Sequence, residues 1–401
     1  MSKVAILGYG VVGSGVYEIL KNTAETVTKN TGKPVEVKYI LDIRDFENHP
    51  EKHLFVKDFA QVLEDKEVDI VAEVIGGATV AYEFTKAALS AGKNVVTSNK
   101  ELVATHGTEL LKLAQDNNVS YLFEASVGGG IPLIHPMHRC LTANNITRIM
   151  GILNGTTNYI LTSMLKDNRS FEDALKSAQE KGYAEANPAA DVEGIDACRK
   201  IAILSSLAYG NSIDCGDIHT EGITKITLTD AKYAEKAGYA IKLIGYSKKE
   251  KDGAEVWVGP MLIPNHMPLS KVDDVFNAGM VTGDNVGDVM FYGRGAGMLP
   301  TASAVVADII DIATGSCTHC PIVWTKPDIK VVEFKNTQSK YYVRAAAADK
   351  NAAISLFDGA EFIATDGDEI AFITENILHK ELEEKLKNFS EVRNYIKVFS
   401  E

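Results

Sequence analysis

The chain has 401 residues, and 45% of them are hydrophobic, which supplies enough apolar material for two or three cores and excludes a disordered protein. Its formal net charge of -13 disfavours nucleic acid and anionic membranes as partners. No apolar run approaches the roughly 20 residues that a membrane helix requires, and the chain begins without a signal peptide, so we expect a cytoplasmic protein.

The first 135 residues alternate short β-rich runs with helical patterns, an order typical of a parallel α/β sheet. Strands are expected at 4–7, 35–43, 69–75, 94–97 and 120–123, and helices at 80–91 and 108–117. Ser98 and Glu101 form a plausible capping box directly after a strand. Residues 97–101 should therefore lie at the carboxyl edge of the sheet, where open α/β sheets bind ligands.

A glycine-rich turn follows the first expected strand and opens a helix. It matches the pattern G-x-G-x-x-G, with Gly8, Tyr9, Gly10, Val11, Val12 and Gly13 in order. The first glycine permits a tight turn, the second lets the backbone approach a pyrophosphate, and the third allows close helix packing. A simple glycine turn is the alternative, but the position between a strand and a helix favours a dinucleotide site.

The end of the second strand bears on the choice of cofactor. Asp42 could accept a hydrogen bond from a ribose hydroxyl, whereas Arg44 could hold the 2′-phosphate of NADP. Asp42 lies further past Gly13 than the usual spacing, so it could equally be a turn residue at the strand end. The sequence therefore leaves NAD and NADP both open.

A second region is expected over residues 136–328, and a break at Pro327 sets off a small α+β module over 329–401. The second region should begin with a helix after Pro132, followed by strands at 146–153 and 256–262 and helices near 157–166, 171–181, 194–209 and 301–313. In the last module, strands are expected at 341–346 and 369–374 and a helix at 380–387. With residues 1–135, this predicts three domains.

Five cysteines are sparse for this length and favour a reducing compartment over a disulfide scaffold. Only Cys317 and Cys320 are close together, and a single pair is weak evidence for zinc, which usually takes four ligands. Free thiols are the simpler interpretation, and a redox-sensitive disulfide is a hypothesis.

Residues 151–200 crowd amide, hydroxyl, carboxylate and amine groups into one segment, which indicates a polar pocket. Asp196 and Lys200 are four residues apart on an expected helix, so both side chains leave the same face, with the carboxylate one turn before the amine. Their apolar neighbours leave little polar surface on that helix. We interpret the pair as a proton-carrying site rather than a solvated ion pair.

Six segments occur in an order that resembles the homoserine dehydrogenases. They are GYGVVG at 8–13, TSNK at 97–100, FEASVGGGIP at 123–132, GILNGTTNYIL at 151–161, GYAEANPAADVEGIDACRK at 182–200 and GRGAG at 293–297. The fourth and fifth segments are specific to that family. The resemblance implies NAD(P)-dependent interconversion of L-homoserine and L-aspartate 4-semialdehyde, in the pathway to threonine, methionine and isoleucine. It also implies that the middle domain binds the substrate and dimerises.

The resemblance implies catalytic roles for two lysines. Lys200 matches the family's proton donor, and Lys100 matches a second lysine that reaches both cofactor and substrate. Reduction of an aldehyde needs a proton or positive charge at the oxygen as it becomes an alkoxide, and a lysine provides either. We expect the two amines to tune each other, with Asp196 mainly orienting Lys200.

The resemblance also implies a substrate site. Glu185 resembles the residue that grips the substrate ammonium group, with Asp196 nearby, while Asn154 and Thr156 would supply neutral hydrogen bonds. Gly182 opens the same motif and is included in this site. Helix capping is the alternative role for Asn154 and Thr156, and a plain loop is the alternative for Glu185.

A cation site is expected where a carboxylate precedes three successive glycines, because such a turn exposes backbone carbonyls that hard cations favour. In the family a monovalent cation, usually sodium, is held there. The matching groups are the Glu124 carboxylate and the backbone of Val127, Gly129 and Ile131. A tight turn without a cation is the alternative.

Further glycines complete the expected cofactor site. Gly295 and Gly297 resemble the family's returning loop, which closes over the nicotinamide side, and Gly76 follows the third long strand.

The C-terminal residues resemble a shortened ACT regulatory domain of βαββαβ order, with a reduced first helix at 350–357. We expect a subunit-contact module with weak or lost feedback by threonine, in a homodimer or a homotetramer. A reductase for another semialdehyde need not carry Glu185, Asp196 and Lys200 together, and a non-catalytic cofactor-binding protein would be expected to lack one or both lysines.

Overall fold

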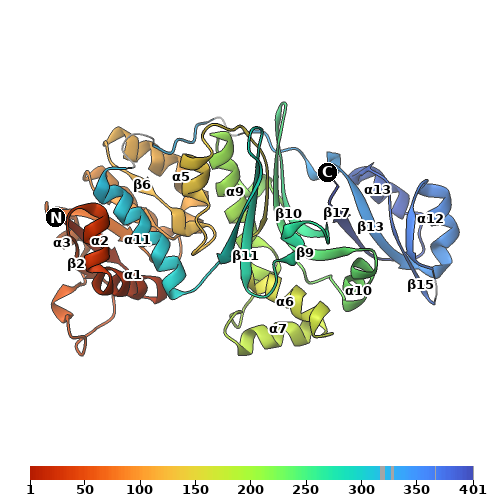
Figure 1. Cartoon of the computed structure of the whole chain (residues 1–401), viewed down its shortest axis with the longest axis horizontal. Helices are drawn as coiled ribbons and strands as arrows, with labels where there is room; N and C mark the ends of the chain where they lie inside the picture. The colour runs from red at the N-terminus through yellow and green to blue at the C-terminus, as the bar shows by residue number, and fades with distance from the viewer. Residues whose placement is uncertain (317–320, 327–328, 366, 401) are drawn as a thin grey trace. The chain divides into compact units, whose positions relative to one another are not determined.

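The computed structural model describes residues 1–316, 321–326, 329–365 and 367–400, and the chain divides into two compact units. The first unit comprises Met1–Asn145, Ala202–Asp214 and Gly293–Ile329, and the second comprises Ile146–Ile201, Cys215–Tyr292 and Lys330–Glu401. Figure 1 shows the chain with its elements labelled. Cys317 and Cys320, the pair considered for a disulfide or zinc, lie outside the described residues.

The first unit is built on a six-stranded sheet in which all neighbouring strands pair in parallel. The strands are β1 (Ser2–Leu7), β2 (Val35–Leu41), β3 (Phe55–Val56), β4 (Val68–Glu73), β5 (Asn94–Thr97) and β6 (Tyr121–Leu122). Their spatial order, β3-β2-β1-β4-β5-β6, is the order of dinucleotide-binding folds, and it reverses between β1 and β4. The expected parallel α/β sheet is therefore confirmed.

Helices accompany this sheet, and the two far apart in sequence, α1 and α11, run side by side (Figure 1). The helices are α1 (Val11–Asn22), α2 (Ala24–Thr31), α3 (Phe59–Glu64), α4 (Thr79–Ser90), α5 (Lys100–Asp116), α11 (Met298–Thr314) and the short turns η1 (Lys52–Leu54), η2 (Glu124–Ser126) and η3 (Pro136–Cys140). A Cβ atom added at Gly15 of α1 would lie 2.9 Å from the Cβ of Ala302 of α11, so a glycine is needed for this approach. Alternate residues of β1, such as Val4 and Ile6, join both helices in one core.

The start of α5 corrects one prediction. The cap is Asn99, whose Oδ1 accepts a hydrogen bond from the amide of Leu102 at 3.1 Å, and the expected capping box of Ser98 and Glu101 is wrong. The helix begins at Lys100 rather than at 108 because its apolar face already starts at Leu102.

The second unit contains a mixed sheet with the path β12-β11-β7-β9-β10-β17-β13-β15-β14. Its strands are β7 (Ile146–Ile152), β8 (His219–Thr220), β9 (Tyr239–Glu250), β10 (Gly253–Pro264), β11 (Phe276–Gly283), β12 (Gly287–Arg294), β13 (Gln338–Ala346), β14 (Glu361–Ala364), β15 (Glu369–Ile373), β16 (Ile377–Leu378) and β17 (Val392–Val398). The strand expected at 256–262 is confirmed as the middle of β10. The strand β9 was not predicted, because its run of consecutive buried residues shows no clear alternation.

The helices of the second unit include those that carry the GILNGTTNYIL and DACRK motifs. They are α6 (Gly155–Lys166), α7 (Phe171–Glu180), α8 (Ala189–Val192), α9 (Ile195–Tyr209), α10 (Leu228–Lys236), α12 (Lys350–Leu356) and α13 (His379–Leu386), with short turns η4 (Cys215–Asp217), η5 (Pro268–Lys271), η6 (Phe334–Asn336) and η7 (Ala347–Asp349). The helix α9 ends with residues that belong to the first unit. The helices expected near 157–166, 171–181 and 194–209 are confirmed.

The C-terminal residues form the succession β13-α12-β14-β15-β16-α13-β17, which is the βαββαβ order apart from the two-residue strand β16. The sheet of this segment continues that of the second unit, because β17 pairs in parallel with β10. Arg344 of β13 anchors the segment to α10, with its Nε 2.8 Å from the Asp230 carboxylate, and both side chains are buried. Tyr342 and Asn394 donate to the same carboxylate.

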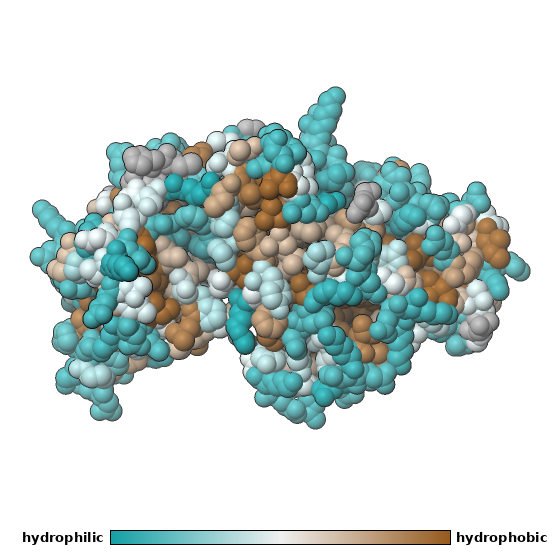
Figure 2. Space-filling view, viewed as in Figure 1, coloured by the Kyte–Doolittle hydropathy of each residue, from teal (hydrophilic) through white to brown (hydrophobic). Residues whose placement is uncertain are grey.

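The face in Figure 2 is largely hydrophilic, with hydrophobic side chains in scattered patches, in keeping with the excess of acidic residues. No helix among the described residues is both long and apolar enough to cross a membrane.

Candidate active site

The glycine-rich turn connects β1 to α1 at the point where the strand order reverses. Gly8 has a φ of +98°, and a Cβ at Gly13 would lie 1.9 Å from the carbonyl oxygen of Gly8, so both positions need glycine. A Cβ at Gly10 would meet no atom within 4 Å. Gly10 is the N-cap of α1, and no side chain of the described residues caps that helix. The amides of its first turn, which begins with Val11 and Val12, can therefore receive an anion.

The carboxylate of Asp42 is occupied by protein donors. It accepts from the backbone amide of Tyr9 at 2.8 Å, from the backbone amide of Arg44 at 2.9 Å and from the Arg44 guanidinium at 2.8 Å. The Arg44 hydrogen bonds hold the pKa of Asp42 well below its usual range. These hydrogen bonds agree with the strand-end turn role of Asp42, because its carboxylate holds both the glycine turn and Arg44. The Arg44 side chain stays 56% exposed and lies over the ring of Phe46.

Tyr9 was expected in the cofactor site, and its side chain packs in an aromatic cluster. Its ring makes edge contacts with Phe46, Phe55 and His49, and its hydroxyl lies 3.2 Å from His49 Nε2. The backbone of Tyr9, not its ring, belongs to the turn.

Lys100 is the first residue of α5 and is half-buried. The Asn99 side chain donates from Nδ2 to the carbonyl oxygen of Gly77 at 2.7 Å and to that of Ile75 at 3.2 Å. The loop after β4, which contains Gly76, and the loop after β5, which leads to Lys100, are therefore joined at one edge of the sheet.

The returning loop and the glycine turn at 128–130 touch each other within the first unit. Gly130 donates its amide to the carbonyl oxygen of Arg294 at 3.1 Å, and a Cβ at Gly129 would lie 2.3 Å from the carbonyl oxygen of Gly295. Gly297 has a φ of +124° and is the N-cap of α11. The expected cation turn and the expected nicotinamide loop are thus neighbours.

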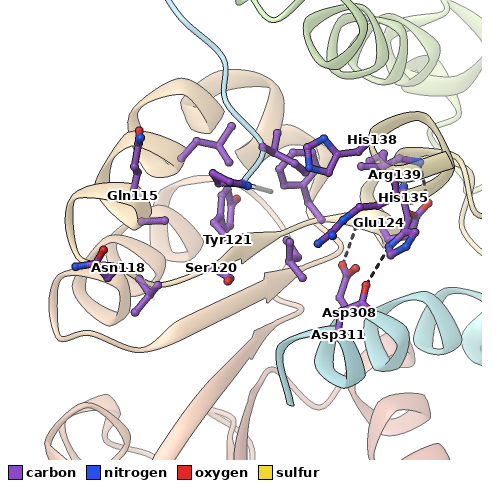
Figure 3. Close-up of a pocket in the computed structure, with 18 residues that line it drawn as sticks. Gln115, Asn118, Ser120, Tyr121, Glu124, His135, His138, Arg139, Asp308 and Asp311 are labelled. Carbon is purple, nitrogen blue, oxygen red and sulfur yellow. Dashed lines mark hydrogen bonds and ion pairs between the residues drawn. The ribbon is translucent and has the colours of Figure 1, made fainter. Parts of the chain in front are cut away.

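The Glu124 carboxylate accepts hydrogen bonds from three successive backbone amides, those of Leu133, Ile134 and His135. The backbone amide of Glu124 in turn donates to the Asp308 carboxylate at 2.9 Å, and Asp311 pairs with His135 at 2.9 Å (Figure 3). Glu124, His135, Asp308 and Asp311 line part of a cavity of about 300 Å³. Val127 and Ile131, the other expected cation ligands, are buried in the same loop.

Burial raises the pKa of both carboxyl groups in this cluster. For Glu124, the three amide donors oppose the effect of burial. For Asp308, the neighbouring Glu124 adds to it, and the pKa lies well above its usual range. Two buried acidic groups beside each other favour a nearby positive charge.

In the second unit, Lys200 and Asp196 form a buried ion pair. Lys200 Nζ lies 2.7 Å from Asp196 Oδ2 and also donates to the carbonyl oxygen of Leu153 at 2.7 Å. The two residues are 8% and 5% exposed. The expected pairing on one helix face is therefore present, and it is shielded from solvent.

Asn154 connects this pair to a second carboxylate. Its Nδ2 donates to Asp196 at 2.9 Å and to Asp191 at 2.7 Å, while its Oδ1 caps α6 by accepting from the amide of Thr157. Asn154 thus caps the helix and also contacts the site. Burial raises the pKa of Asp191, with the Asn154 hydrogen bond opposing and Asp196 adding to the effect.

Of the remaining expected substrate residues, Thr156 lies in α6, whereas Gly182 and Glu185 lie in the loop before α8. Thr156 donates its hydroxyl to the carbonyl oxygen of Tyr183 at 2.7 Å, which fixes that loop to α6. Gly182 has a φ of +73°, and Glu185 is exposed. In the described part of the chain, the Glu185 carboxylate has no ion pair, and its backbone carbonyl accepts from Gln179. The structure does not bring Glu185 into contact with the ion pair.

Sequence reasoning missed two buried carboxyl groups, Glu73 and Asp308, and the half-buried carboxyl group of Asp191. Each carried a signal: Glu73 ends an apolar strand, Asp308 interrupts the apolar face of α11, and Asp191 stands in the same motif as Asp196. A charged residue inside an apolar run is rarely buried without a partner or a function.

Comparisons with known proteins agree with this geometry. The family model described as homoserine dehydrogenase, NAD binding domain, matches residues 8–124, and the model described as homoserine dehydrogenase matches residues 132–310. A homoserine dehydrogenase of Pseudomonas aeruginosa is 39% identical over 396 residues, which cover 96% of this chain and 89% of that protein. One of Bacillus subtilis is 43% identical over 314 residues, covering 77% and 72%.

Solved structures give the same result. A homoserine dehydrogenase from Thiobacillus denitrificans matches with a TM-score of 0.91 at 36% identity, covering 100% of this chain and 98% of that one. A hyperthermophilic archaeal homoserine dehydrogenase mutant in complex with NADPH matches with a TM-score of 0.67 at 29% identity, covering 78% and 98%. The glycine turn at the strand-order reversal, the buried Asp196–Lys200 pair and these similarities together show that the chain belongs to the homoserine dehydrogenase family, oxidoreductases that act on a CH–OH group with a nicotinamide cofactor.

Proposed function

We propose that Lys200 and Lys100 act together on the substrate oxygen in the interconversion of L-homoserine and L-aspartate 4-semialdehyde. The nicotinamide cofactor, when bound, exchanges a hydride with the substrate carbon. In the direction of reduction, Lys200 donates a proton from Nζ to the oxygen as it becomes an alkoxide, and Lys100 places positive charge beside it. In the direction of oxidation, Lys200 takes up the hydroxyl proton. Asp196 and the Leu153 carbonyl orient the Lys200 amine.

The observation that carries this proposal is the shielding of the Asp196–Lys200 pair from solvent inside a motif of the family. A surface ion pair would contribute little and would not need the second contact to Leu153. Asn154, which bonds both Asp196 and Asp191, links the amine to the remainder of the motif.

The experiment is a spectrophotometric assay of homoserine oxidation with the full chain and three variants. Lys200→Ala and Lys100→Ala should each reduce kcat by about a hundredfold or more, the range of acid–base catalysis by one side chain. Lys176→Ala, an exposed lysine of α7, is the matched control and should retain turnover. Near-normal turnover of Lys200→Ala would remove its assigned role.

For the substrate, we propose that Glu185 and Asp196 bind the ammonium group, while Asn154 and Thr156 provide hydrogen bonds and Gly182 allows the turn that carries Glu185. The contacts of Asn154 support adding Asp191 to this set. Because Glu185 is exposed and makes no ion pair in the described residues, its carboxylate is available to a positively charged ligand.

For the cofactor, we propose NADP, held by the turn of Gly8, Gly10 and Gly13. Arg44 supports the choice of NADP: its guanidinium is 56% exposed at the end of β2, where folds of this type receive the 2′-phosphate. Asp42, the alternative partner for a ribose hydroxyl, already accepts from Tyr9 and Arg44.

Exposed apolar residues at the same edge support a nucleotide site. Ile43, after β2, is 91% exposed, and Val80, in the first turn of α4, is 51% exposed. We propose that these two side chains pack against the adenine ring, which removes their apolar surface from water. Gly76, Gly295 and Gly297 would then lie along the remainder of the cofactor, beside Lys100.

We also propose that the loop at 124–131 binds a monovalent cation, sodium being the family expectation. A carboxylate offers about four acceptor positions, and three amides use three of those of Glu124, so one remains for a cation. The raised pKa values of Glu124 and Asp308 support this placement, because a cation beside them would favour their ionised forms. Carbonyl groups of Val127, Gly129 and Ile131 would complete the site, and the ion would stabilise the loop rather than take part in the reaction.

We propose three domains: a cofactor-binding domain at 1–135, a catalytic, substrate-binding and dimerisation domain at 136–328 and an ACT-like module at 329–401. The βαββαβ order supports the likeness to ACT domains. The first helix, α12, has only seven residues, which supports reduced regulation. Titration with threonine should leave the activity of the full chain nearly unchanged, and strong inhibition would contradict this. We propose that the protein forms a homodimer or a homotetramer in the cytoplasm.

A further inference from the structure

Glu73 is the last residue of β4 and lies at the point where the strand order of the sheet reverses. Its side chain is fully buried. A buried carboxylate is costly unless hydrogen bonds satisfy it, so its partners indicate what it is for.

The carboxylate of Glu73 contacts both neighbouring loops. Oε1 accepts from the backbone amide of Ile75 at 2.7 Å, in the loop after β4. Oε2 accepts from the hydroxyl of Thr97 at 2.5 Å, at the end of β5. A threonine hydroxyl has one hydrogen, so donation to Glu73 leaves its oxygen to accept, and it accepts from the backbone amide of Asn99 at 2.9 Å.

Asn99 continues the network to the start of α5. Its Oδ1 caps the helix through the amide of Leu102, and its Nδ2 donates to the carbonyl oxygens of Ile75 and Gly77. The next residue is Lys100. One chain of hydrogen bonds therefore runs from Glu73 through Thr97 to the residue that precedes the lysine.

We propose that Glu73 is a positioning residue of this dehydrogenase, whose carboxylate acts through Thr97 and Asn99 to hold Lys100 at the start of α5. The inference rests on the role of Lys100 under the proposed function. The ionised carboxylate is required because both of its oxygens accept, so turnover is compared at pH 8, above the pKa of about 7 that burial gives Glu73. An amide in the same place would turn an N–H group toward either the Ile75 amide or the Thr97 hydroxyl, both of which donate.

The alternative is that the network only stabilises the two strand ends. The two roles differ in how Glu73 couples to Lys100. A positioning residue loses its effect on turnover when Lys100 is absent, whereas a residue that stabilises the fold affects both backgrounds equally.

The experiment measures kcat, KM for homoserine, binding of NADPH by fluorescence and the melting temperature. The variants are Glu73→Gln, Thr97→Val, Lys100→Ala and the double variant Glu73→Gln/Lys100→Ala. Glu73→Gln and Thr97→Val should each lower kcat by about ten- to a hundredfold, the cost of a small misplacement of a catalytic group, with NADPH binding within about threefold of the unaltered chain. The double variant should be no slower than Lys100→Ala alone, within about twofold.

Two controls accompany these variants. Asp69→Asn makes the same chemical change on an exposed carboxylate of β4 and should leave kcat unchanged. Thr97→Ser keeps the hydroxyl and should recover most of the turnover lost in Thr97→Val.

The outcomes separate the inference from the function on which it rests. If Glu73→Gln turns over normally, or if it slows the Lys100→Ala background as much as the unaltered chain, the positioning role is overturned. If Lys100→Ala is fully active, the proposed catalytic role of Lys100 is wrong, and the single variant shows this without reference to Glu73.

Discussion

Lys200 and Asp196 form an ion pair in which the ammonium nitrogen lies 2.7 Å from a carboxylate oxygen one helical turn earlier, with both side chains buried. Removing one member of such a pair leaves an uncompensated buried charge, whereas removing both does not. The pair therefore allows stability and turnover to be separated experimentally.

Asp196→Asn should lower the free energy of unfolding by about 3–5 kcal/mol and should also reduce kcat. Lys200→Met combined with Asp196→Leu should restore most of the stability but none of the turnover. Urea unfolding and the homoserine assay measure the two properties. A double variant as unstable as Asp196→Asn would show that packing, not charge, holds the helix.

Arg44→Ala should weaken binding of NADP+ by about ten- to a hundredfold, the value of hydrogen bonds to a charged group, and should change KM for NAD+ much less. The reason is that only NADP+ carries the 2′-phosphate that the exposed guanidinium is proposed to meet. Lys57→Ala, an exposed lysine after β3, is the control. An equal loss with both cofactors would assign Arg44 to the turn rather than to the phosphate.

The stability of Glu73→Gln relative to the unaltered chain should increase as the pH rises. Burial raises the pKa of Glu73 to about 7, against the hydrogen bonds from Thr97 and Ile75. The unfolded chain ionises this group near pH 4, so the folded state binds the extra proton between the two values, and its stability falls as pH rises through that window.

The difference in melting temperature between Glu73→Gln and the unaltered chain should therefore grow in favour of the variant from pH 5 to pH 8. Two and a half pKa units correspond to about 3 kcal/mol at most. The nearby Tyr121 on β6 does not contribute to this pH dependence, because it stays neutral between pH 5 and pH 8. Burial, and to a lesser extent the charge of Glu73, raise the pKa of Tyr121 well above 10. If the difference in melting temperature did not change with pH, Glu73 would have the ordinary pKa of a carboxyl group, and the prediction would be wrong.

Sodium chloride should raise the melting temperature more than choline chloride at equal ionic strength, and more at pH 8 than at pH 5. Glu124 and Asp308 have raised pKa values, so their ionisation costs stability as pH rises, and a bound cation offsets that cost. Glu124→Gln should abolish the difference between the two salts. A sodium effect that survives in Glu124→Gln would move the cation away from this loop.

The glycine turn and the Asp196–Lys200 pair could be predicted because each is local, and the parallel sheet could be predicted because strands and helices alternate along the chain. A strand followed by Gly8, Gly10 and Gly13 and then a helix is contiguous in the chain, and a spacing of four residues sets two side chains on one helix face whatever surrounds it. The capping box at Ser98 was wrong by one residue, because several polar residues in a row can serve as a cap. The strands β9 and β11 were not predicted, since runs of consecutive buried residues remove the alternation by which strands are recognised. The strand β12 was not predicted either, and its residues are exposed or half-buried.

The amino-acid sequence by itself determined the dinucleotide turn, the order of the elements and the motifs that identify the family, because these depend on neighbours along the chain. Only the tertiary structure decided that Asp42 serves Tyr9 and Arg44, that Glu73 joins Thr97, and that Glu124 meets Asp308, 184 residues away. Such contacts follow from the order of strands in the sheet and from the packing of α11 beside the sheet, and no periodicity in the sequence encodes either.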